Sequence, residues 1–207
     1  MTARAFFLPG VGGDPHFWQP VGALLPDHEQ VHFGWPGLGN TPPDPDVNSY
    51  EDLIRLVVAR FDGRPVDLVA QSMGGALAMA IALRYPDMVR RLVLTVTAGG
   101  MDISRLGASD WRPDYRREFP HVADWVVDQR PDVSRHIADI AQPTLLLWGD
   151  DDPISPVAVG QYLQSALPDA RLHVVMGGQH DLARTHAAKI APLISDFLAE
   201  KCQRSSA

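Results

Sequence analysis

The sequence predicts an α/β fold, with a mostly parallel, doubly wound sheet of about six strands and helices on both faces. Two observations predict this class. Short, continuous apolar runs alternate along the chain with longer segments of helical periodicity, and such runs suit parallel strands that are buried on both faces. A repeated succession of strand, helix and strand implies parallel pairing through right-handed crossovers.

The expected strands are runs rich in Val, Leu and Phe. They occupy residues 6–8, 31–33, 66–70, 92–96, 144–148 and 172–175. The expected helices show an apolar face or an Ala-rich composition between these runs. They occupy residues 50–61, 74–84 and 187–197, and residues 133–140 also have a helical pattern.

Length and composition predict one globular domain over residues 1–207. The chain is 45% hydrophobic and 21% charged, and a chain of this length can bury a sizeable core without disulfides or metals. Residues 98–143 are the least regular part, because Pro113, Pro120 and Pro131 divide them. We expect a small helical cap insertion there, over the end of the sheet.

Charge and targeting signals exclude several partners. The formal net charge is −7, which gives no electrostatic reason to bind nucleic acid or an anionic membrane. The uncharged stretch 68–83 is too short and too polar for a membrane span, and the apolar run 5–8 is too short for a signal peptide. With a single cysteine, Cys202, no intramolecular disulfide can form. We therefore expect a cytoplasmic protein.

Neither a cofactor nor a metal is expected. His28 and His32 have a spacing of four residues but lack a clustered third ligand. The glycines at positions 10 and 12 begin a dinucleotide-binding pattern, but Pro15 stands where its last glycine would be required.

The most informative stretch is residues 66–77, where a buried strand leads through Ser72 directly into a helix. A sharp strand-to-helix turn needs small residues two positions on either side of its central serine, and Ala70 and Gly74 satisfy this requirement. The alternative is a tight packing turn in which Ser72 only caps the helix.

This stretch resembles the nucleophile elbow of the α/β-hydrolase family, G-x-S-x-G, with Ala70 in place of the first glycine. The resemblance covers residues 6 to about 198. It implies the α/β-hydrolase fold without its first N-terminal strands, with the strand order 2-1-3-4-5-6, and it makes Ser72 the nucleophile. An acid and then a histidine should follow at later strand ends.

Both follow in that order. The strand 144–148 leads into Gly149 and three aspartates, and the family's acid loop assigns Asp152 as the triad acid, with Asp151 as its rival. The strand 172–175 leads into a Gly-rich turn that ends at His180, the expected general base. The carboxylate would orient the imidazole and stabilise its protonated form.

The resemblance also implies an oxyanion hole made of two backbone N–H groups. Met73 follows the nucleophile, and Val11 lies in the Gly-rich loop after the first strand, where Pro9 replaces a histidine found in many relatives. Four residues are further expected to contact the substrate: Gly10, Gln71, Trp111 and Trp125. Plain packing within the insertion is the alternative for the two tryptophans.

Together these residues predict a serine hydrolase that cleaves a small carboxylic ester through an acyl-enzyme on Ser72, with a small-molecule ester as its partner. A serine at the elbow argues against the dehalogenase and epoxide-hydrolase branches of the family. Two alternatives remain open. The same triad serves lactone, thioester, amide or carbon–carbon bond hydrolysis and perhydrolysis, because fold does not fix the substrate. The other is a low-turnover ligand-sensing or interaction module.

Overall fold

The computed structural model describes residues 4–129 and 131–200, so that Cys202 lies outside the described residues. Six strands form one sheet in the order β2-β1-β3-β4-β5-β6, and every neighbouring pair is parallel. The predicted class and strand order are confirmed. The strands are β1 (Arg4–Leu8), β2 (Gln30–His32), β3 (Val66–Gln71), β4 (Val89–Thr95), β5 (Thr144–Gly149) and β6 (Ala170–Val175).

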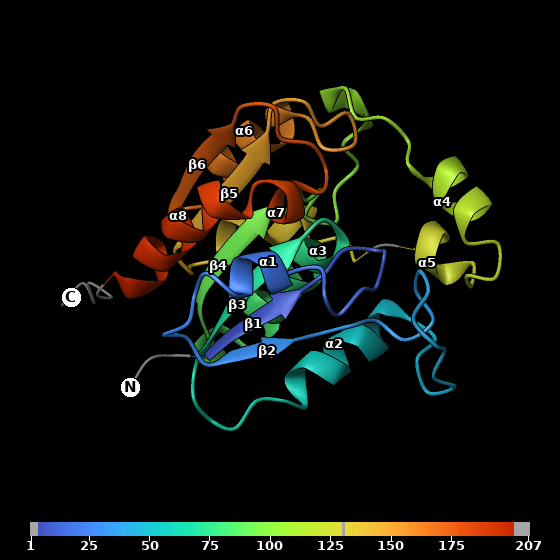
Figure 1. Cartoon of the computed structure of the whole chain (residues 1–207), viewed down its shortest axis with the longest axis horizontal. Helices are drawn as coiled ribbons and strands as arrows, with labels where there is room; N and C mark the ends of the chain where they lie inside the picture. The colour runs from blue at the N-terminus through green and yellow to red at the C-terminus, as the bar shows by residue number, and fades with distance from the viewer. Residues whose placement is uncertain (1–3, 130, 201–207) are drawn as a thin grey trace.

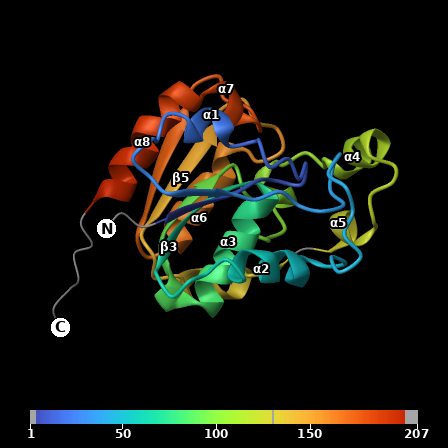
Figure 2. The ribbon, with the colours of Figure 1, turned by 60° about the horizontal axis from the view of Figure 1, so that its bottom comes forward.

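Helices cover both faces of the sheet (Figures 1 and 2). One face carries α1 (Gln19–Gly22), α7 (Leu182–Thr185) and α8 (Ala187–Ala199). The other carries α2 (Tyr50–Val58), α3 (Met73–Arg84) and α6 (Val157–Ala166). A short 3₁₀ helix, η1 (Pro86–Met88), leads from α3 into β4.

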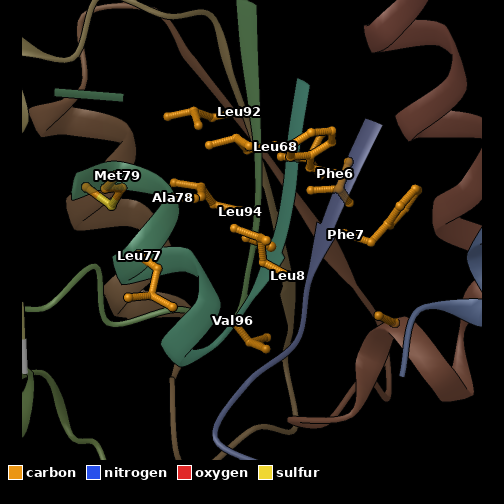
Figure 3. Close-up of a cluster of buried hydrophobic side chains, with 14 of the residues drawn as sticks. Phe6, Phe7, Leu8, Leu68, Leu77, Ala78, Met79, Leu92, Leu94 and Val96 are labelled. Atoms are coloured by element: carbon orange, nitrogen blue, oxygen red, sulfur yellow. The ribbon is translucent and has the colours of Figure 1, made fainter. Parts of the chain in front are cut away.

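The core lies on both sides of the central strands, against α3 on one face and against α1 and α8 on the other. All six residues of β3 are buried, as expected for a strand that is covered on both faces. In Figure 3, Leu68 and Leu94 point from β3 and β4 toward Leu77 and Met79 of α3, whereas Phe7 points to the opposite side of the sheet. The two sets of helices are therefore packed on two apolar surfaces of the same sheet.

Most element boundaries differ from the sequence prediction by one to three residues, and two of these differences have a clear physical cause. Helix α2 ends at Val58 and not at residue 61, because Arg60 N and Phe61 N bond to carbonyls only three residues back and tighten the last turn. Strand β4 ends at Thr95, one residue early, because Val96 adopts a positive φ of 43°. A positive φ cannot continue a strand.

The segment between β4 and β5, residues 98–143, contains four short helices and no strand in its described part. They are η2 (Ser104–Leu106), α4 (Arg112–Glu118), α5 (Trp125–Asp128) and η3 (Ser134–Asp139), the last being a 3₁₀ helix in the stretch expected to be helical. Helices α4 and α5 lie apart from the sheet in both views, at the right (Figures 1 and 2). Within the described ranges, no helix is both long and apolar enough to cross a membrane.

Candidate active site

Ser72 lies between the last residue of β3 and the first residue of α3. Its φ of 52° and ψ of −120° are unusual for a residue other than glycine, and such strained residues cluster at functional sites. The turn is tight because α3 begins directly against the β1 loop. A Cβ atom on Gly74 would lie 2.5 Å from Pro9 O and 2.7 Å from Leu8 O, which explains the need for a glycine at this position.

The main chain of Ser72 is held from the adjacent strand. Ser72 N donates to Thr95 O at 2.9 Å. The hydroxyl of Thr97 donates to Ser72 O at 2.6 Å and accepts from Gly99 N at 3.0 Å. Thr97 thus fixes the strained turn from the end of β4, a role for which its sequence neighbourhood gives no signal.

The structure brings Ser72, His180 and Asp152 together from three strand ends. Ser72 Oγ lies 2.9 Å from His180 Nε2, and His180 Nδ1 lies 2.8 Å from Asp152 Oδ2. The Asp152 side chain is fully buried, and its Oδ1 accepts from Ile154 N at 2.8 Å. A carboxylate can only accept, so Nδ1 carries a proton and Nε2 is free to accept the proton of Ser72.

The other two aspartates of the acid loop do not contact the histidine ring. Asp150 Oδ1 accepts from Gly177 N at 2.6 Å. Asp151 has an exposed side chain, and its backbone N donates to Gly178 O at 2.9 Å. Both residues tie the acid loop to the Gly-rich turn that precedes His180.

The two predicted oxyanion donors flank the serine. A Cβ atom on Gly10 would collide with Gln71 Oε1 and lie 3.1 Å from Ser72 Cβ, so the loop that carries Val11 packs directly on the elbow. Val11 and Met73 both line the cavity that contains Ser72. Within the described residues, neither backbone N–H donates to another backbone carbonyl.

Ser72 and His180 open onto a cavity of about 260 Å³. Trp111, which was expected to contact substrate, lines it together with Tyr50, Met101 and Ile154. The wall is not wholly apolar, since three charged residues also line it: Asp102, Asp110 and Arg112.

Three residues expected to contact substrate do not line this cavity in the described structure. Gln71 Nε2 instead donates to His180 O at 3.0 Å, which supports the histidine loop. Gly10 packs against Gln71. The ring of Trp125 packs edge-on against Tyr50, with centroids 5.3 Å apart, whereas Val127 of the same helix lines the cavity.

No group of three or more His, Cys, Asp or Glu side chains in the described residues is placed to hold a metal ion.

Two further residues that sequence reasoning missed are Tyr50 and Tyr115. The hydroxyl of Tyr50 donates to Val126 O at 2.7 Å, and that of Tyr115 donates to Val11 O at 2.8 Å. Each of these two hydrogen bonds joins the segment 98–143 to a distant part of the chain. No local sequence pattern therefore reveals the two tyrosines.

Residues 5–193 match the sequence profile of the alpha/beta hydrolase family. Among curated proteins, a poly(3-hydroxyalkanoate) depolymerase of Ectopseudomonas oleovorans is 28% identical over 95% of this chain and 84% of its own length. A pimeloyl-[acyl-carrier protein] methyl ester esterase of Neisseria meningitidis is also 28% identical, over 94% of this chain and 93% of its own length. A 2-hydroxymuconate semialdehyde hydrolase of Pseudomonas sp. is 30% identical over 79% of this chain and 73% of its own length.

Solved structures share the fold. A meta-cleavage product hydrolase from Pseudomonas fluorescens has a TM-score of 0.76 at 19% identity and covers 94% of this chain and 90% of its own. A putative lipase from Acinetobacter baumannii has a TM-score of 0.78 at 20% identity, covering 95% of this chain and 83% of its own.

Proposed function

This chain belongs to the alpha/beta hydrolase family, and on that premise we propose that it is a serine hydrolase that cleaves a small carboxylic ester through an acyl-enzyme on Ser72. The observation that carries the proposal is the continuous chain of contacts from Ser72 Oγ through the His180 ring to Asp152. A serine hydroxyl alone is a weak nucleophile, and an adjacent base with an orienting carboxylate activates it.

In the proposed first step, His180 Nε2 takes the proton of Ser72 as Oγ attacks the ester carbonyl carbon. The resulting imidazolium is stabilised by Asp152, whose carboxylate lies 2.8 Å from Nδ1. The imidazolium then gives its proton to the departing alcohol oxygen, which leaves the acyl group on Ser72. In the second half, His180 takes a proton from water, the hydroxide attacks the acyl carbon, and Ser72 recovers its proton as the acid leaves.

The backbone N–H groups of Val11 and Met73 are proposed to bind the oxygen that becomes negative in each tetrahedral intermediate. Met73 is the first residue of α3, so its N–H has no partner within the helix and lies at the positive end of the helix dipole. Both residues line the cavity with Ser72. Donors that are fixed before the reaction cost no reorganisation when the charge develops.

Two relatives support an ester as the substrate, because the names of the Neisseria and Ectopseudomonas proteins describe a methyl ester esterase and a polyester depolymerase. The cavity of about 260 Å³ is near the lower end of small-molecule sites, which run from about 300 Å³ upward. We therefore expect a compact acyl group to be bound, with the larger part of a long substrate left outside.

Carbon–carbon bond hydrolysis is the second candidate. The 30% identical relative is a 2-hydroxymuconate semialdehyde hydrolase. The same triad serves both reactions because the nucleophile and the fold do not choose the substrate. Lactone, thioester or amide hydrolysis and perhydrolysis use the same residues, and a ligand-sensing module would bind without turnover.

A panel of aryl esters of increasing acyl length, lactones, thioesters and 2-hydroxymuconate semialdehyde tests these candidates. Steady-state rates are measured for the wild type, Ser72→Ala and Ser165→Ala, a control that removes an exposed hydroxyl on α6. We expect ester turnover that peaks at short acyl chains, is lost in Ser72→Ala and persists in Ser165→Ala. Faster cleavage of the semialdehyde would favour the second candidate, and saturable binding without turnover would favour the sensing module.

A further inference from the structure

Tyr115 of α4 links the segment between β4 and β5 to the loop that carries Val11. Its hydroxyl donates to Val11 O at 2.8 Å and accepts from Gly39 N at 3.1 Å. The residue is only 7% exposed. One phenol therefore joins three segments that are distant in sequence, namely the β1 loop, the β2–α2 loop and α4.

The contact falls next to the peptide unit that carries the proposed oxyanion donor. The Gly10–Val11 peptide contains the Val11 N–H, and its oxygen accepts from Gly13 N at 3.1 Å. The following peptide contains Val11 O, which accepts from Tyr115. Two successive peptide units are thus fixed, one on each side of the Val11 Cα atom, so the direction of the Val11 N–H depends on both bonds.

The surroundings hold the phenol in place. Its ring packs between Trp111 and Phe119, with centroids 5.5 and 5.0 Å away. Gly39 has a φ of 54°, and a Cβ atom there would collide with Gly12 O, so the β2–α2 loop lies directly against the β1 loop. Burial raises the pKa of the Tyr115 phenol above its ordinary value, so the hydroxyl keeps its proton and remains a donor at neutral pH.

We infer that Tyr115 is a positioning residue for the oxyanion hole, acting through Val11 O to hold the Val11 N–H toward the reacting oxygen. The inference rests on the proposed function. It also gives α4 a role in positioning the oxyanion hole, in addition to lining the cavity through Trp111 at its N-terminus. Because the donor matters most when negative charge develops, loss of the bond lowers transition-state binding more than substrate binding.

The test is Tyr115→Phe, which removes the hydroxyl but keeps the ring contacts. Removal of one oxyanion donor costs about 100- to 1,000-fold in kcat, and a misdirected donor retains part of its effect. We expect kcat to fall roughly 10- to 100-fold with KM within about twofold. The inhibition constant of an alkyl boronic acid, which forms a tetrahedral adduct on Ser72, should rise by a similar factor. Rates are expressed per site labelled by a fluorophosphonate, which corrects for any unfolded fraction.

His121→Ala is the matched control. His121 Nε2 lies 3.0 Å from Gly39 O, so this variant removes the neighbouring contact of the same segment without touching Val11. Its kcat should remain within about twofold of the wild type. Equal losses in both variants, or an unchanged kcat in Tyr115→Phe, would overturn the inference while leaving the proposed function intact. A wild type that neither labels at Ser72 nor turns over any ester would overturn both.

Discussion

The Oδ2 atom of Asp152 lies 2.8 Å from the Nδ1 atom of His180, which distinguishes one acid in a run of three. Asp150 accepts from the backbone of Gly177, and Asp151 is exposed. Of the two candidates that the sequence leaves open, Asp151 and Asp152, it is therefore Asp152 that contacts the histidine ring. Its catalytic role is testable with single substitutions.

Asp152→Asn should lower kcat by about 1,000- to 10,000-fold, because an amide can hold the imidazole in the wrong tautomer and cannot stabilise its charge. Asp151→Asn is the matched control and should stay near the wild-type rate. Steady-state kinetics and thermal melts of both variants provide the check. A large loss in Asp151→Asn with a small one in Asp152→Asn would contradict the assignment.

Thr97 should support the elbow through its hydroxyl, which donates to Ser72 O and accepts from Gly99 N. Thr97→Val keeps the shape but leaves both partners unpaired, which typically costs about 1–3 kcal/mol. We expect that loss in the free energy of unfolding from urea titration, together with a lower kcat. Thr97→Ser keeps the hydroxyl and should recover most of the activity. Equal behaviour of the two variants would show that the hydroxyl is dispensable.

Gly74→Ala should disturb the approach of α3 to the β1 loop. The added Cβ would lie 2.5 Å from Pro9 O, a backbone atom that cannot move aside without shifting the loop. Overpacking of this kind costs about 1–3 kcal/mol. Gly12→Ala is the matched control for stability, since a Cβ there meets nothing within 4 Å. Urea titrations that give the two variants the same free energy of unfolding would argue against this packing.

Asp52 should make the start of α2 sensitive to acid. A hydrogen bond from the backbone N–H of Asn48 is the largest cause that lowers the pKa of Asp52 below its ordinary 3.8. A lowered pKa in the folded state contributes stability above pH 3.8, and this stability is lost as the pH falls through the lowered value. Asp52→Asn should therefore destabilise the protein at neutral pH, and the difference from the wild type should shrink in acid. A difference that stays constant with pH would exclude this ionisation as the cause.

Much of the fold follows from local patterns. The apolar runs predict all six strands. The four central strands, β1, β3, β4 and β5, are buried on both faces, which requires continuous apolar runs, whereas the edge strands β2 and β6 are partly exposed. The triad side chains are also local signals, each placed just after a strand end, and the structure brings Ser72, Asp152 and His180 within hydrogen-bonding distance. Their catalytic roles stay predictions.

The rest could not be predicted because it depends on contacts between distant segments. Tyr115 meets Val11 across more than a hundred residues, and its own neighbours in sequence give no sign of this contact. Trp125 has a large apolar side chain that suits an acyl pocket, but its ring packs against Tyr50. Whether such a side chain faces the cavity is set by how α5 packs against α2, which periodicity does not specify.

Activation of Ser72 is tested by the intact mass of the protein after exposure to a fluorophosphonate probe, for the wild type, Ser72→Ala and the control Ser165→Ala. The probe reports an activated serine without a guessed substrate. We expect one adduct on the wild type and on Ser165→Ala, and none on Ser72→Ala. A folded wild-type protein that forms no adduct, or an adduct that persists in Ser72→Ala, would contradict the assignment of Ser72 as the activated nucleophile.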